Sequence, residues 1–136
     1  MAPTRLIYAS TRTDQSAAAL DAIFDVSRAY NLRDDITGAL IVSDKHYVQL
    51  LEGNRSLISQ CMMRIAHDSR HTEIELIAVN LVPHRLFARW SLHRIETPTL
   101  EARTLEPFLI DGAFQPKLMP QLAIEDLCRV LSSEAD

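Results

Sequence analysis

Residues 36–52 read ITGALIVSDKHYVQLLE, two apolar runs that are separated by only two polar residues. The first run covers 36–43 and the second covers 46–52, with Asp44 and Lys45 between them. β-branched and aromatic residues are enriched in strands, and a two-residue connection is typical of a hairpin. The stretch therefore predicts two neighbouring antiparallel strands.

The segments on either side of this hairpin follow one pattern, a strand and a helix. An apolar run predicts a strand at 4–9, and the helix-period spacing that follows predicts a helix at 14–30. After the hairpin, a helix is predicted at 55–67 and a strand at 73–81. This order is the ferredoxin-like βαββαβ arrangement. We therefore expect an α+β fold in which one sheet carries both helices on the same face.

The remaining sequence adds a fifth strand and a helical tail to this core. The strand is predicted at 90–95, a weak helix at 100–108 and a better one at 119–131. The last helix has an apolar face that either covers the free face of the sheet or serves as an interface. The residues of that face are Leu122, Leu127 and Leu131.

Composition excludes several classes of protein. A chain of 136 residues is expected to form one domain, and its 47% hydrophobic and 24% charged residues are ordinary for a globular protein. A net charge of −4 without a basic block argues against a nucleic-acid binder. No apolar stretch approaches membrane-spanning length. Cys61 and Cys128 are isolated and lie in apolar surroundings, so we expect core residues, no metal site and a soluble cytoplasmic chain.

Widespread catalytic motifs such as GxGxxG, the P-loop, HExxH and GxSxG are absent from the sequence. Single polar residues must then carry the function, and each has a structural alternative. Gln49 lies between apolar strand residues, where it either faces solvent or needs buried hydrogen-bond partners. Tyr8 by itself is a core aromatic and Asn31 a helix C-cap. Taken alone, Trp90 is a core residue and His71 a loop residue. Arg64 and Asp68, four positions apart, form a surface helix pair.

Four blocks of this sequence resemble the BLUF domain, a family of blue-light sensors that use flavin. The blocks are LIYAS at 6–10, YNLRDDITGALIVSDKHYVQLLEG at 30–53, RIAHDSRH at 64–71 and RLFARWSLH at 85–93. Members typically carry a tyrosine in the first strand, an asparagine before an ITG-type strand, a Q-x-LEG strand, a D-x-RH turn and a W-S-M strand. All of these features occur here in the same order, with leucine in place of the final methionine.

The resemblance implies that residues 1–95 form a flavin-binding photosensor domain and residues 96–136 a helical cap or output extension. It implies that the flavin ring lies between the two helices. FAD is the usual flavin of the family, and FMN and riboflavin are alternatives. The residues expected at the flavin are Tyr8, Asn31, Gln49, Arg64, Asp68 and His71.

The resemblance also implies a mechanism of light sensing. Tyr8 matches the photoactive tyrosine and Gln49 the switching glutamine, and Ser10, Trp90 and Leu92 are expected to relay the signal. Light would drive electron and proton transfer from Tyr8 through Gln49, whose amide rotates or tautomerises and shifts the absorption to the red. The chain is then a photoreceptor and not an enzyme. Its expected partners are a downstream protein or further copies in a homo-oligomer.

Two positions depart from the family pattern. Leu32 stands where many members carry a second asparagine, so one polar anchor is lost. Leu92 stands where members commonly have methionine, and leucine keeps the volume but lacks the sulfur. We therefore expect the photochemical centre to be complete and the output route to differ.

Three other functions remain open on the sequence alone. An acylphosphatase-like enzyme would use Arg12 near the first strand, but no glycine-rich turn accompanies it. The second is a regulatory module that binds a small metabolite. The third is a small flavin redox enzyme.

Overall fold

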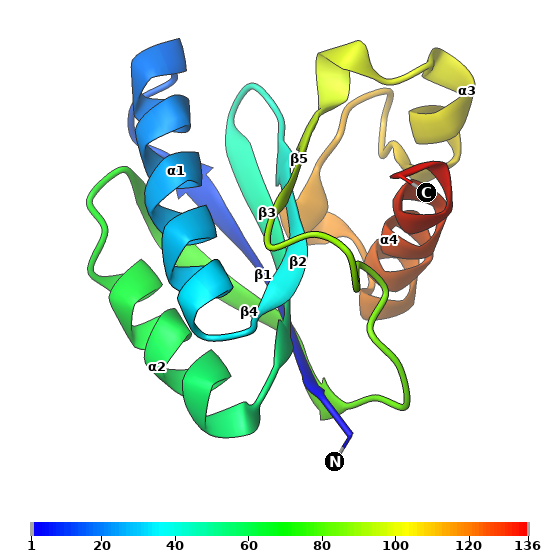
Figure 1. The fold of residues 1–136 in the computed structure, drawn as a ribbon. Helices are drawn as coiled ribbons and strands as arrows, with labels where there is room; N and C mark the ends of the chain where they lie inside the picture. Colours follow the sequence, from blue (N-terminus) through cyan, green and yellow to red (C-terminus); the bar gives the residue numbers. More distant parts are fainter. Residues whose placement is uncertain (1, 136) are drawn as a thin grey trace.

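The fold is seen in a computed structural model that describes residues 2–135 (Figure 1). Its helices and strands are β1 (Thr4–Arg12), α1 (Ala17–Arg33), β2 (Thr37–Val42), β3 (His46–Gly53), α2 (Arg55–Ala66), β4 (His71–Leu81), β5 (His93–Glu96), α3 (Ala102–Leu105) and α4 (Gln121–Ala135). Short 3-10 helices cover Thr97–Thr99, Glu106–Phe108 and Pro116–Leu118.

The strands form one five-stranded sheet in the order β4-β1-β3-β2-β5. The first four strands are antiparallel and β5 runs parallel to β2. The predicted α+β fold with a ferredoxin-like core is confirmed. So is the hairpin: Thr37 pairs with Glu52 and Val42 with Tyr47, and Ser43 N–H donates to His46 O at 3.0 Å beside the two-residue turn.

Gly38 explains why the chain has ITG at the start of β2. A Cβ at this position would lie 1.9 Å from Leu50 O, inside the neighbouring strand. Only glycine lets the two backbones approach this closely. Gly38 N–H points away from β3 and donates to Trp90 O at 3.0 Å. The glycine therefore fixes both the hairpin and the segment that precedes β5.

Side-chain caps set where the two long helices begin. The Ser16 side chain accepts from Ala19 N–H at 3.1 Å, so α1 begins at residue 17 and not at 14 as predicted. Asn54 caps α2 in the same way. The C-cap of α1 is Asp34, and Asn31 lies inside the last turn. The C-cap alternative for Asn31 is therefore wrong.

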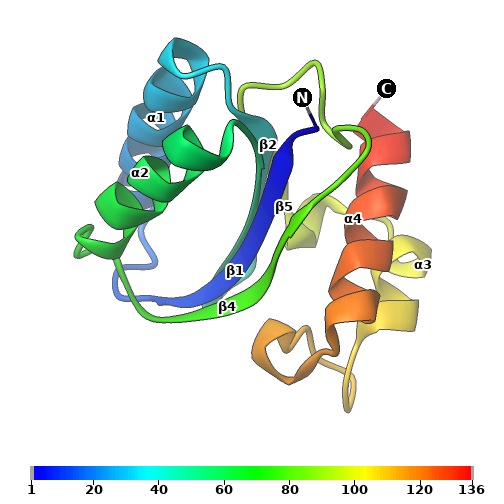
Figure 2. The same cartoon turned by 90° about the horizontal axis from the view of Figure 1, so that it is seen from below.

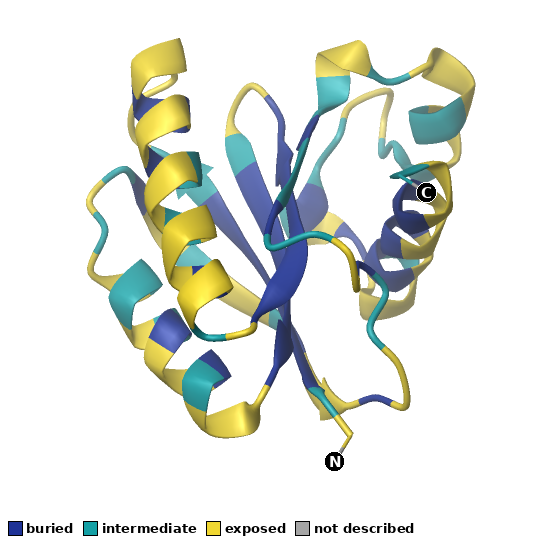
Figure 3. Ribbon diagram, viewed as in Figure 1, coloured by how far each residue is buried: buried dark blue, intermediate teal, exposed yellow. Residues whose placement is uncertain are grey.

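The sheet separates two layers of helices. Figure 2 shows α1 and α2 on one face of the curved sheet and α3 and α4 on the other. In Figure 3 the strands β1, β2 and β3 are mostly buried, whereas the edge strand β4 and much of α1 are exposed. The tail helix packs Leu127 and Leu131 into the main apolar cluster, together with Ile7 and Val48 of the sheet. Leu122, predicted on the same apolar face, is 70% exposed.

The predicted fifth strand begins too early. The strand starts at His93, three residues later than predicted. Alternate residues of a strand share a face, but Trp90 packs against the cluster beneath α4 and Leu92 against the cluster beneath α1. Turn-like contacts explain this, because Trp90 N–H donates to Phe87 O at 3.0 Å. The weak helix predicted at 100–108 is reduced to α3 and the 3-10 helix Glu106–Phe108.

Among residues 2–135, no helix has the length and apolar character needed to cross a bilayer. The same part of the chain brings together no group of three or more His, Cys, Asp or Glu side chains that could hold a metal ion.

Burial of Cys128 leads to a prediction for alkaline pH. Burial raises the pKa of the Cys128 thiol from 9.0 to about 12. A folded-state pKa above the unfolded value means that stability is complete below pH 9 and is lost as the unfolded thiol ionises above it. We expect the free energy of unfolding to fall by about 1–2 kcal/mol between pH 8 and pH 10 on this account. Urea denaturation checks this, because Cys128→Ala should flatten the pH dependence; an unchanged slope contradicts it.

Candidate functional site

A buried tyrosine and a buried glutamine face each other across two strands. Tyr8 of β1 and Gln49 of β3 are partners in the antiparallel register, and they are 1% and 2% exposed. The Tyr8 hydroxyl donates a hydrogen bond to Gln49 Oε1. The amide nitrogen therefore points away from Tyr8. Within residues 2–135, this buried Nε2 has no hydrogen-bond partner, which is costly unless a ligand supplies an acceptor.

Burial also controls the protonation of this pair. Burial raises the pKa of Tyr8 well above its ordinary value, and the neighbouring Cys61, Asp68 and Tyr47 raise it further. Burial raises the pKa of Cys61 as well. The Tyr8 phenol is therefore protonated at neutral pH and is able to donate.

A second buried amide lies near this pair, on α1. Asn31 is fully buried, and its Nδ2 donates to Ser91 O at 2.8 Å. Its Oδ1 is 3.8 Å from Cys61 Sγ, and Cys61 packs with Tyr8 in one apolar cluster. An amide NH₂ carries two hydrogens, so one N–H of Asn31 is left over. The sequence did not single out Cys61 as the contact between Asn31 and this cluster.

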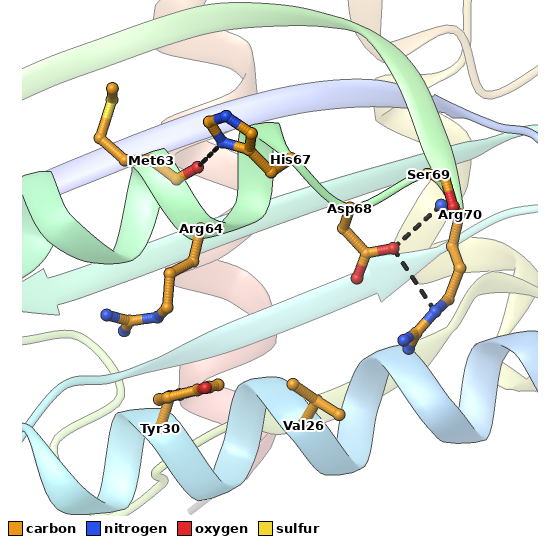
Figure 4. Close-up of a pocket in the computed structure, with 8 residues that line it drawn as sticks. All are labelled: Val26, Tyr30, Met63, Arg64, His67, Asp68, Ser69 and Arg70. Carbon is orange, nitrogen blue, oxygen red and sulfur yellow. Dashed lines mark hydrogen bonds and ion pairs between the residues drawn. The ribbon is translucent and has the colours of Figure 1, made fainter.

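A cleft of about 630 Å³ opens between the two helices (Figure 4). Figure 4 shows Val26 and Tyr30 on α1 and Arg64 extending from α2 across the cleft. The Arg64 guanidinium lies 4.3 Å from the centre of the Tyr30 ring and 3.4 Å from Asp34 Oδ2. Val26 and Tyr30 are large exposed residues at this surface. The cleft therefore combines exposed apolar side chains with a cation.

Asp68 lines the same cleft but does not pair with Arg64. It lies beyond the end of α2, where its Oδ1 accepts from Arg70 N–H at 2.9 Å and lies 3.4 Å from the Arg70 side chain. The surface helix pair proposed for Arg64 and Asp68 is therefore wrong. Both residues instead line the space between the helices, together with His67.

His71 ties the first strand to the end of α2. Ile65 O can only accept, so the His71 Nε2 that lies 2.8 Å from it carries a proton. In the neutral ring Nδ1 then accepts from the Ser10 hydroxyl at 2.7 Å. His71 is buried, and its ring meets Tyr8 edge-on at 6.0 Å. Both nitrogens are bonded within the protein, so this geometry supports positioning of β1 rather than direct ligand contact.

The predicted relay residues lie in different surroundings. Leu92 is buried in the cluster beneath α1 with Leu40, the cross-strand partner of Gln49. The Trp90 ring packs on His93 at 4.1 Å, on the side of α4. Leu32 is 73% exposed. Of these residues, Leu92 is packed nearest to the glutamine strand.

A buried ion pair on the opposite face of the sheet was not predicted. Arg5 Nε lies 2.9 Å from Glu52 Oε2, and the carboxylate of Glu52 is fully buried. Glu52 Oε1 accepts from Leu86 N–H at 2.8 Å, and Leu86 O accepts from Ser132 Oγ at 2.5 Å. These contacts connect β1 and β3 to α4.

The sequence over residues 4–93 matches the model of one known family, BLUF, described as sensors of blue-light using FAD. The matched stretch contains Tyr8, Asn31, Gln49 and the cleft between the helices. The chain belongs to the BLUF family. It is therefore a flavin-binding domain with a sensor's role rather than an enzyme's.

Known BLUF proteins are similar to this chain in sequence and in structure. It is 30% identical over 87 residues to the blue light- and temperature-regulated antirepressor BluF of Escherichia coli, which is 63% of this chain and 22% of BluF. The chain thus spans about a fifth of that relative. The dark state of the BLUF protein BlrB has a TM-score of 0.85 at 29% identity and covers 98% of this chain and 97% of BlrB. The photo-activated state of BlsA has a TM-score of 0.84 at 25% identity, covering 96% and 94%.

The geometry of this chain fits a flavin. A cleft of about 630 Å³ is of the size that ligand pockets commonly have. The buried amides of Gln49 and Asn31 have N–H groups to spare, and a flavin ring offers nitrogen and carbonyl acceptors along one edge. The BLUF match decides against the acylphosphatase-like and metabolite-binding alternatives.

The Ser10–His71 bond leads to a stability prediction. Ser10→Ala leaves a buried imidazole nitrogen unpaired and should lower the free energy of unfolding by about 1–2 kcal/mol. Ser59→Ala is the matched control, because Ser59 is exposed on α2 and bonds only to Arg55 O of its own helix; it should stay within about 0.5 kcal/mol. Urea denaturation measures both variants. Equal losses would show that the buried Ser10–His71 bond contributes no more to the free energy of unfolding than the exposed Ser59 bond.

Proposed function

We propose that this chain is a blue-light photoreceptor domain in which Tyr8 and Gln49 form the switch. The observation that carries the proposal is the buried Gln49 Nε2, which has no partner among residues 2–135, next to an Oε1 that is bonded to Tyr8. A carboxamide has a donor end and an acceptor end of nearly the same shape. Its rotation therefore reverses the hydrogen bonds on both sides without a change in packing.

The residues that would hold the flavin come from three elements. Gln49 of β3 and Asn31 of α1, both buried, would each offer a spare amide N–H to the ring, and Arg64 of α2 presents its guanidinium at the cleft. Asp68 contributes an acceptor at the end of α2. His71 holds β1 in place through Ser10. When bound, the flavin supplies an oxidant that blue light switches on and an absorption band that reports the hydrogen bonds around it.

The chain's own part in the light reaction is the movement of a proton and of an amide. Tyr8 is protonated and donates along the bond to Gln49 Oε1, so its electron and proton can leave in the same direction. Loss of that proton removes the donor that holds the amide in its dark orientation. Gln49 then rotates or tautomerises. When Tyr8 is protonated again, its oxygen faces the rotated or tautomerised amide instead of the original Oε1 acceptor.

The resulting signal is small and needs an element that is already near balance. One hydrogen bond contributes about 0.5–1.5 kcal/mol net, which can only shift an existing equilibrium. Two elements connect the surroundings of the switch to the surface. One is the segment that contains Trp90 and Leu92, whose Ser91 carbonyl is bonded to Asn31; the other is α4, which is bonded through Leu86 to Glu52 of the glutamine strand. Output then goes to a downstream protein or to other copies in a homo-oligomer, in the cytoplasm; residues 96–136 are proposed as the output extension.

We further propose that the flavin is FAD. Three basic side chains, Arg64, His67 and Arg70, line the cleft and suit a phosphate-bearing tail, which FAD and FMN share, and the description of the matching family names FAD. Protein purified in the dark should release FAD on acid extraction, measured by chromatography against FAD, FMN and riboflavin standards. Release of FMN or riboflavin alone would contradict this assignment and leave the switch unaffected.

The switch is tested with two substitutions and a control. Gln49→Leu removes both ends of the amide, and Tyr8→Phe removes only the hydroxyl. Each should bind flavin and lose the reversible red shift in difference spectra taken before and after blue light. Gln60→Leu changes an exposed glutamine of α2 and should keep the full shift. A Gln49→Leu variant with the full reversible shift would overturn the mechanism.

A further inference from the structure

A second cleft lies on the other side of α1, away from the flavin site. It has a volume of about 660 Å³ and runs between the Arg28 and Leu32 turns of α1 and the segment Arg89–Arg94. We name it the arginine groove. None of its lining residues lines the cleft between α1 and α2.

The arginine groove carries positive charge that the protein does not neutralise. Arg28 and Arg89 are exposed, and among residues 2–135 neither makes an ion pair or a side-chain hydrogen bond. Arg94, at the other end, is already bound to Asp21 at 2.7 Å and lies 3.5 Å from Glu96. Two guanidinium groups without a partner among residues 2–135 therefore line the same cleft, although the net charge of the chain is −4.

An apolar surface lies between these charges. Leu32 is 73% exposed and lines the groove beside the two arginines. Trp90 presents a half-buried ring that packs on His93 at 4.1 Å. Arginine binds carboxylates in a planar, bidentate manner, and exposed leucine and tryptophan favour an apolar contact beside it. The groove thus fits a ligand that is both acidic and apolar.

One wall of the groove is attached to the switch. Asn31 Nδ2 donates to Ser91 O at 2.8 Å, and Gly38 N–H donates to Trp90 O at 3.0 Å. Leu92, which follows Ser91, packs with Leu40 opposite Gln49. A changed hydrogen-bond pattern at Asn31 therefore acts directly on the segment that lines the groove, and one at Gln49 reaches it through Leu40 and Leu92.

We propose that the arginine groove docks an acidic segment of a partner protein, with an apolar residue against Leu32 and Trp90, and that light changes its affinity. The proposal rests on the proposed function for its light dependence only. Nucleic acid is disfavoured as the occupant, because its binding depends on many phosphate contacts and two free arginines neutralise few phosphates. A short partner segment with one or two carboxylates needs only the two arginines that the groove offers.

The test measures binding of a short fluorescein-labelled peptide of glutamate, aspartate and leucine by anisotropy, in the dark and under blue light. Wild-type holoprotein should bind it, more weakly at about 0.3 M salt, and should not bind the counterpart with lysine in place of the acids. Arg28→Glu/Arg89→Glu should weaken binding about tenfold or more. Arg55→Glu/Arg103→Glu makes the same change in net charge at two exposed arginines elsewhere and should weaken it less than about twofold.

Each other outcome overturns part of the proposal. No binding of the acidic peptide, or equal weakening in the two double variants, would remove the groove as its site. Tighter binding of a single-stranded oligonucleotide than of the peptide would make nucleic acid the occupant. Groove-dependent binding that is the same in the dark and in the light would remove the coupling. The red shift is recorded on the same samples, so its absence in the wild type would count against the proposed function and not against the groove.

Discussion

A buried carboxamide must satisfy both of its ends, and in this protein the fold satisfies only one. The β1–β3 register places Tyr8 opposite Gln49, and the phenol donates a hydrogen bond to the amide oxygen. The nitrogen remains in an interior that offers it no acceptor among residues 2–135. Because an unpaired buried donor is destabilising, the geometry favours a ligand with an acceptor at that place. Flavin binding and light sensing follow from the same half-satisfied amide.

The strand that carries this glutamine also carries the contact to the other face of the sheet. Gln49 points toward the helices α1 and α2, and Glu52, three residues later, points toward α4. Glu52 is held by Arg5, which lies three residues before Tyr8 on the neighbouring strand. Both members of the switch are therefore linked by rigid strands to one buried ion pair. A buried pair of this kind adds little net stability, but it fixes the position of the segment that contacts α4.

Sequence reasoning reached the fold because local patterns and tertiary structure agree over most of the chain. The hairpin, the two long helices and the order of elements along the chain follow from apolar periodicity and from turn chemistry. It failed where tertiary contacts replace local ones. Trp90 and Leu92 alternate like strand residues, yet Gly38 and Asn31 bind the intervening backbone, so these side chains enter different clusters.

The site was predicted less completely than the fold. Tyr8 and Gln49 could be paired only through a family resemblance, because a single glutamine in a strand is equally consistent with a solvent-facing position. The role of His71 depends on the carbonyl of Ile65, which no sequence pattern marks. The Arg5–Glu52 pair joins residues far apart in the chain and becomes visible only once the register is known. Charged residues in apolar strands were the one available signal for it.

The two departures from the family pattern lie on the two sides of one structural unit. Leu92 is buried against Leu40, and Leu32 is exposed one residue after Asn31, which bonds to the carbonyl of Ser91. A leucine at position 92 can transmit a change only through packing, since it has no polar atom to exchange a hydrogen bond. Position 32, in turn, no longer offers an amide and presents an apolar side chain to solvent. In the proposed mechanism, output depends on how the 90–92 backbone is held, and the surface that this backbone shares with Leu32 is where a partner would sense it.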